Sequence, residues 1–155
     1  MLKYYCILGK GSELMNNTLE YLKNNGIDVD LGLSFIGDET SYKELLLEFK
    51  NGFINQMNEI KTLYESKDIE NYGIKVHALK SNCKTFGIMT FANMAYEHEM
   101  AAKNGDINFI NQNITNLFVK ANELYKVLDL LHIEFENSWH GKDTMQKWLL
   151  AQKHV

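Results

Sequence analysis

The sequence HALKSNCKTFG, which begins at His77, sets a single histidine between two residues with very small side chains. Gly73 lies one helical turn before the histidine, and Ser81 lies one turn after it. A helical projection at about 100° per residue places Lys80 and Lys84 in the same sector, roughly 140° from the middle of the apolar stripe. We therefore expect His77 to face water in a small clearing bordered by positive charge.

An accessible neutral imidazole is a nitrogen nucleophile that titrates near neutral pH. Lysines beside it can balance the charge of a phosphoryl group. A glycine inside a helix costs about 1 kcal/mol relative to alanine, so Gly73 suggests that the ring needs free access. The alternative is that this is an ordinary solvent-exposed helix face with no chemical role, because most polar helix faces have none. The segment suits a side chain that receives and passes on a phosphoryl group.

Apolar residues at steps of three and four predict the helices that must hold this histidine. A first helix is expected from Ser12 to Asn25, where an Asn-Gly pair marks its end. The following sequence IDVDLGLSFIG indicates a connector with one helical turn. Ser41 and Glu44 have capping-box spacing and predict the start of a long helix that runs to about Lys67.

From Tyr42 onward the sequence contains four successive apolar stripes. Asp106 is placed to cap the helix that carries the last of them. The stripes comprise Tyr42, Leu45, Phe49, Phe53, Met57, Ile60 and Tyr64; Tyr72, Val76, Leu79, Cys83 and Phe86; Phe91, Met94, Ala95, His98, Ala101 and Ala102; and Ile107, Ile110, Ile114, Leu117, Ala121, Leu124, Leu128, Leu131 and Phe135. Short turns between them make neighbouring helices antiparallel. We predict an all-α fold: an antiparallel four-helix bundle with an additional N-terminal helix and a short C-terminal helical tail.

The length and composition indicate one ordered domain. The chain has 155 residues, no proline and a formal net charge of -4. We expect a lead-in over residues 1–11, the bundle over residues 12–136 and a tail over residues 137–155. The negative charge disfavours nucleic acids and anionic membranes, and no stretch approaches the ~20 apolar residues of a membrane span. Cys6 and Cys83 lack metal-ligand spacing, which indicates reduced thiols in a cytoplasmic protein.

The residues around the histidine resemble the histidine-containing phosphotransfer (HPt) domains of bacterial and plant phosphorelays, whose pattern is H-x-L-K-G-x-[SA]-x-x-x-G. Four positions match in place: His77, Leu79, Lys80 and Gly87. Ser81 stands where glycine is usual, and Cys83 stands where serine or alanine is usual. The later stretch AYEHEMAAKNGD is similar to the end of the next helix in that family, with these residues in register: Glu99, Ala101, Ala102, Lys103, Gly105 and Asp106.

This resemblance, which covers residues 27 to 131, implies a phosphocarrier and not an enzyme in its own right. His77 would be the phosphoacceptor, through Nε2, and Lys80 would balance the charge of the phosphate. The access and docking surface would comprise Gly73, Ser81, Lys84 and Gly87. The implied partners are a response-regulator receiver domain, which carries the magnesium ion, and a hybrid histidine kinase. The chain itself would bind no metal or cofactor and would act as a monomer.

Two other functions stay open, as does the possibility that the chain is a domain of a hybrid sensor kinase. One is a helical adaptor that binds a kinase or receiver domain without carrying phosphate. The other is a metal-binding four-helix bundle, although the paired Glu-x-x-His motifs of di-iron proteins are absent.

Three further residues carry expectations about the interior and the site. His98 stands where the HPt family usually has leucine, and we expect it to be a core residue with a hydrogen-bond partner. Gln56 and Glu59 are the two candidates for the group that orients the His77 ring through Nδ1.

Overall fold

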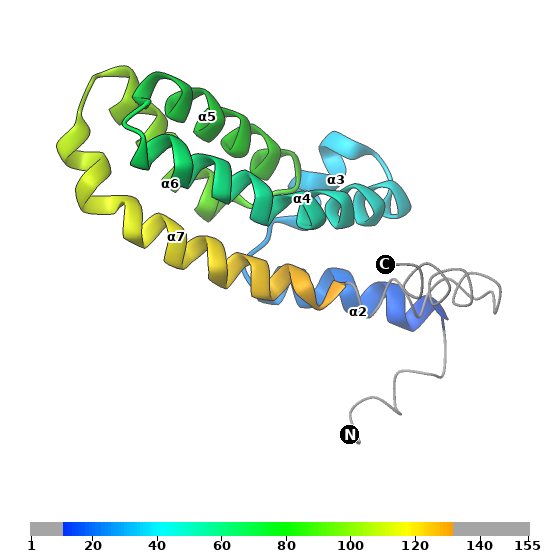
Figure 1. Ribbon diagram of the computed structural model, residues 1–155. Helices are drawn as coiled ribbons and strands as arrows, with labels where there is room; N and C mark the ends of the chain where they lie inside the picture. Colours follow the sequence, from blue (N-terminus) through cyan, green and yellow to red (C-terminus); the bar gives the residue numbers. More distant parts are fainter. Residues whose placement is uncertain (1–10, 132–155) are drawn as a thin grey trace, which may run out of the picture.

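In the computed structural model, the chain is described over residues 11–131, with side chains from residue 18 onward, and this part is built from helices without strands (Figure 1). The helices are α2 (Gly11–Asn24), α3 (Val29–Ile36), α4 (Glu39–Glu65), α5 (Ile69–Thr85), α6 (Met89–Lys103) and α7 (Ile107–Asp129). The predicted all-α class is confirmed for these residues. The lead-in before residue 11 and the predicted tail over residues 137–155 lie outside the described residues, as do Cys6 and Phe135.

Aspartates begin four of the six helices. Asp28, Asp38, Asp68 and Asp106 precede α3, α4, α5 and α7, and each carboxylate accepts a hydrogen bond from the backbone N–H three residues later. Such a cap satisfies one of the donors that the first turn of a helix leaves unpaired. The cap predicted at Asp106 is confirmed.

The predicted start of α4 and the predicted extent of helix in the connector before it were wrong. Asp38, and not Ser41, caps α4: its carboxylate lies 2.8 Å from the backbone nitrogen of Ser41, so the helix begins at Glu39. The connector expected to contain one helical turn forms the eight-residue helix α3. This helix is stabilised by packing against α4 and α5, which buries Val29 and Gly32.

Gly87 lies in the turn between α5 and α6 and is buried. Its φ of +77° is in the left-handed region, and its carbonyl accepts a hydrogen bond of 2.9 Å from the backbone N–H of Asp28. A Cβ at this position would lie only 1.8 Å from the carbonyl oxygen of Asp28. Both the left-handed φ and the close backbone crossing require glycine. Gly87, which the family resemblance placed on the access and docking surface, is therefore a buried packing residue.

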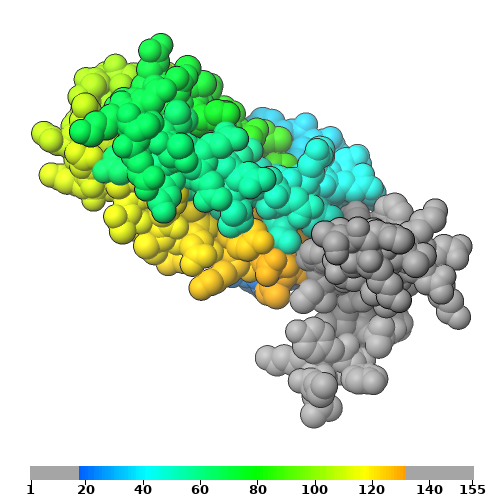
Figure 2. Space-filling view, viewed as in Figure 1, coloured from blue at the N-terminus to red at the C-terminus, as the bar shows by residue number. Residues whose placement is uncertain are grey.

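The four long helices contact one another in a closed sequence: α4 packs against α5, α5 against α6, α6 against α7 and α7 against α4. Short connections reverse the chain between successive helices (Figure 1). Helix α2 reaches α7 through the Tyr21 hydroxyl, which donates to the carbonyl of Val127 at 3.3 Å. In the space-filling view, α3 (cyan) continues the surface of α4, and α7 (yellow to orange) borders the opposite edge (Figure 2).

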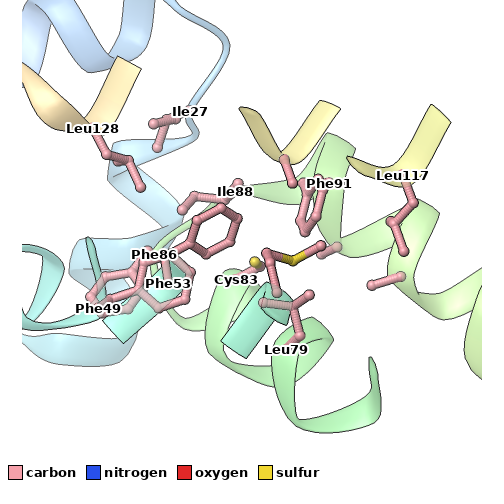
Figure 3. Packing of buried hydrophobic residues seen from close by; sticks show 14 of the residues in the cluster. Ile27, Phe49, Phe53, Leu79, Cys83, Phe86, Ile88, Phe91, Leu117 and Leu128 are labelled. Carbon is pink, nitrogen blue, oxygen red and sulfur yellow. The ribbon is translucent and has the colours of Figure 1, made fainter. Parts of the chain in front are cut away.

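The interior is rich in aromatic rings. Phe49 lies 5.5 Å from Phe53 and 5.2 Å from Phe86 between ring centroids, and the three rings form one group (Figure 3). Most residues of the predicted stripes are buried, but Leu45 is 43% exposed and Ile107 is 49% exposed. Leu46 takes the core position next to Leu45 and is fully buried. Ile107 is the first residue of α7.

Among the described residues, none of the helices combines the length and the apolar composition that crossing a bilayer requires.

Candidate functional site

His77 lies in the middle of α5 with 55% of its side chain exposed. The buried side of the same helix carries Tyr72, Val76, Leu79 and Cys83, which hold α5 against the core. The water-facing orientation expected from the helical projection is confirmed. Ser81 and Lys84 are also exposed, as expected.

Glu99 of α6 lies against the His77 ring. Its Oε1 is 2.7 Å from Nδ1 of His77 and 2.8 Å from Nζ of Lys103, and its Oε2 is 2.6 Å from Nζ of Lys80. Only 1% of the Glu99 side chain is exposed. One buried carboxylate therefore links the exposed histidine to two lysines, one from α5 and one from α6.

Neither of the two residues proposed from the sequence orients the ring. Glu59 instead forms an ion pair of 2.8 Å with Lys75, and the side chains of both residues are about half exposed. Gln56 has a buried Oε1 without a hydrogen-bond partner among the described residues. Glu99 was included in the family resemblance without a role. Its contact with His77 follows from the register in which α5 and α6 pack. The sequence of either helix alone does not contain that register.

The Glu99 carboxyl is ionised at neutral pH. Burial by itself raises its pKa, but the hydrogen bonds from Lys103, Lys80 and His77 outweigh burial and lower the pKa to about 2. An ionised carboxylate can only accept hydrogen bonds, so the proton of the contact with a neutral ring belongs to Nδ1 of His77. The lone pair of the neutral imidazole is then on Nε2. No described residue forms a hydrogen bond with Nε2.

The lysines around the ring differ in how they are held. Lys80 is 16% exposed, and its ammonium lies over the ring of Tyr96 at 5.2 Å from the centroid as well as on Glu99. Lys103 is 62% exposed and shares Oε1 of Glu99 with the histidine. Lys84 is exposed and forms no ion pair with another described residue. The structure thus brings Lys80 and Lys103 to the site, and sequence reasoning assigned no role to Lys103.

A cavity of about 650 Å³ opens beside the His77 ring, between the first half of α5 and the last turns of α6. Gly73, His77, Glu99 and Lys103 are among its lining residues, whereas Ser81 is not. The space next to the ring therefore lies on the Gly73 side. A Cβ at Gly73 would also lie 3.0 Å from the Cβ of Ala102, so this glycine permits close helix packing in addition to access.

His98 follows the expectation of a core residue. It is 2% exposed, and its Nδ1 shares a hydrogen bond of 2.8 Å with the hydroxyl of Tyr72. Burial lowers the pKa of His98 to about 4, so the ring is neutral at pH 7. Within residues 18–131, no group of three His, Cys, Asp or Glu side chains is arranged to hold a metal ion.

Comparison of the chain with models of known protein families, with curated proteins and with solved structures gave no match. What bears on the function is therefore the geometry of His77 and its neighbours.

Proposed function

We propose that the protein is a cytoplasmic phosphorelay intermediate of the HPt type, in which α4, α5, α6 and α7 form an antiparallel four-helix bundle. His77 accepts a phosphoryl group from the aspartyl phosphate of one receiver domain and passes it to another. The observation that carries this proposal is the pairing of an exposed imidazole with a buried, ionised Glu99. That pairing keeps the proton on Nδ1 and leaves the lone pair on Nε2, which forms no hydrogen bond with a described residue.

The proposed step is an in-line displacement at phosphorus. The Nε2 lone pair forms the N–P bond while the P–O bond to the receiver aspartate breaks, and the aspartate leaves as a carboxylate. The ring then carries hydrogen on Nδ1 and phosphate on Nε2, so positive charge develops on it. The Glu99 carboxylate, 2.7 Å from Nδ1, stabilises that charge. The same step in reverse returns the phosphoryl group to a second receiver.

Two lysines support the proposed charge balance. The ammonium groups of Lys80 and Lys103 are both within 2.8 Å of Glu99, so their positions next to the ring are defined before phosphate arrives. A phosphoryl group brings two negative charges, which pre-positioned cations stabilise without reorganisation. The magnesium ion of the reaction belongs to the partner receiver domain in this proposal, and the chain acts as a monomer without a cofactor of its own.

The test is a phosphotransfer assay with a receiver domain carrying radiolabelled aspartyl phosphate and Mg²⁺. We expect acid-labile, alkali-stable label on the wild-type protein and none on His77→Gln. The substitution is at a half-exposed site, so the fold should survive, which a thermal melt checks. Label at the wild-type level on His77→Gln would reject the assignment. Binding of the receiver without any label on the wild type would favour the adaptor function.

A further inference from the structure

The contacts between α5 and α6 follow a single antiparallel register. His77 meets Glu99 at 2.7 Å, and one turn later Lys80 lies over the ring of Tyr96. One turn before His77, the backbone of Gly73 faces the methyl group of Ala102. The Gly73–Ala102 contact between α5 and α6 therefore lies one helical turn from the contact that orients the histidine.

The Gly73–Ala102 contact is sterically tight. A Cβ on Gly73 would lie 3.0 Å from the Cβ of Ala102, whereas two carbon atoms prefer a separation of about 3.5–4.0 Å. A side chain at residue 73 therefore requires Ala102 to shift by a few tenths of an ångström relative to α5. We infer that Gly73 and Ala102 are positioning residues that set the spacing of α5 and α6 so that Glu99 reaches Nδ1 of His77.

The distances at the site explain why the spacing matters. The 2.7 Å contact is at the short end of the range for N–H···O hydrogen bonds, and several tenths of an ångström of separation bring it to the long end, near about 3.2 Å. Glu99 is also bound to Lys80 of α5 at 2.6 Å, so separation of the helices stretches two contacts at once. A ring released from Glu99 exchanges its proton between Nδ1 and Nε2, and the nucleophilic lone pair is then no longer confined to Nε2.

This role predicts an unusual separation of stability from function. Alanine forms helices better than glycine, so Gly73→Ala gains helix propensity while it crowds Ala102. The variant should remain folded while its histidine geometry changes. An access role for Gly73 alone would not involve Ala102.

The experiment uses the full chain and four variants. Gly73→Ala adds the crowding methyl group, and Ala102→Gly removes its partner. The double variant Gly73→Ala/Ala102→Gly again has one methyl group in the contact. Gly52→Ala is the matched control, because it adds a methyl group to the interior of α4 where nothing lies within 4 Å. Nitrogen-15 NMR of the histidine rings reports which nitrogen of His77 is protonated, and the phosphotransfer assay reports the rate.

For Gly73→Ala we expect loss of the pure Nδ1–H tautomer and a rate of phosphoryl acceptance about tenfold lower. The double variant should regain the wild-type tautomer and a rate within about twofold of wild type, and Gly52→Ala should match wild type in both. A wild-type tautomer in Gly73→Ala, or no recovery in the double variant, would overturn the inference.

Only the rate measurement rests on the proposed function. If the wild type accepts no phosphate, the phosphorelay proposal fails, whereas the tautomer of His77 in the four variants still decides whether Gly73 and Ala102 set the spacing.

Discussion

Two histidine contacts join α5 to α6, and they lie on opposite sides of the same helix pair. On the solvent side, His77 of α5 is half exposed and contacts Glu99. On the core side, His98 of α6 is buried and contacts the hydroxyl of Tyr72. The two α6 residues are adjacent in sequence, yet one belongs to an ionised network and the other to a neutral pair.

The difference shows what burial does to an ionisable group with and without charged partners. Burial favours the neutral form of both His98 and Glu99. Among the described residues, no cation or anion offsets this effect at His98, so its pKa falls to about 4. At Glu99 the hydrogen bonds from Lys103, Lys80 and His77 reverse the effect, and the pKa falls to about 2. We interpret the neutral pair as a structural contact and the ionised network as the functional one.

Breaking the ionised network should have the largest effect. Glu99→Gln keeps the shape of the side chain but removes the charge that fixes the proton on Nδ1 and balances two lysines. We expect phosphoryl acceptance by His77 to fall by about 10²- to 10³-fold, or about 3–4 kcal/mol in activation free energy. Initial rates with a phosphorylated receiver domain measure this loss.

Glu59→Gln is the matched control for this substitution. Glu59 pairs with Lys75 on an exposed surface, so its loss should change stability by less than about 1 kcal/mol and leave the rate unchanged. Equal rates for Glu99→Gln and wild type would remove the functional distinction between the two histidine contacts.

As the pH falls, His98 should be protonated and its pair with Tyr72 destabilised before Glu99 of the ionised network is protonated. His98 has a pKa of about 4 in the folded protein and 6.5 as its ordinary value, so between these values the unfolded chain binds a proton that the folded chain does not. Stability is therefore complete above pH 6.5 and falls as the pH decreases. We expect a loss of roughly 2 to 3 kcal/mol between pH 6.5 and 4.5. Glu99, whose ordinary pKa is 4.5, adds its own loss only below that pH.

Urea unfolding at pH values from 4.5 to 8 measures this dependence. His98→Leu serves as the control: its absolute stability also reflects the lost contact with Tyr72, so the slope with pH is the informative quantity. A slope in His98→Leu equal to that of wild type would show that His98 does not cause the dependence.

Residue periodicity predicted the parts of the fold that depend on one helix at a time. The all-α class, the exposure of His77 and the burial of His98 were predictable because each follows from the spacing of apolar residues along a helix. The cap at Asp106 was predictable because aspartate is a favourable residue just before the first turn of a helix. The start of α4 was wrong because two acceptors compete near it. Asp38 reaches the backbone N–H of Ser41 and so begins the helix earlier.

The residues that depend on two helices were not predictable in this way. Glu99 has a charged side chain beside an apolar stripe, which suggests exposure until α5 supplies Lys80 and His77 as partners. The role of Gly87 depends on Asp28, which lies 59 positions earlier in the chain and crosses directly over it. Periodicity within a single helix contains no information about such contacts.

Removal of the Tyr72 hydroxyl group, on the core side of the helix pair, should have the smallest of these effects on the protein. Tyr72→Phe keeps the aromatic ring, whose centroid lies 6.3 Å from that of His98, and removes only the hydroxyl group. Loss of one buried hydrogen bond should cost about 1–2 kcal/mol of unfolding free energy at pH 7. The rate of phosphoryl transfer should stay within about twofold of wild type, because the His77–Glu99 contact lies on the other side of the helix pair. A large fall in rate together with unchanged stability would mean that the two contacts are coupled through α6, and the separation of a structural from a functional side would then be wrong.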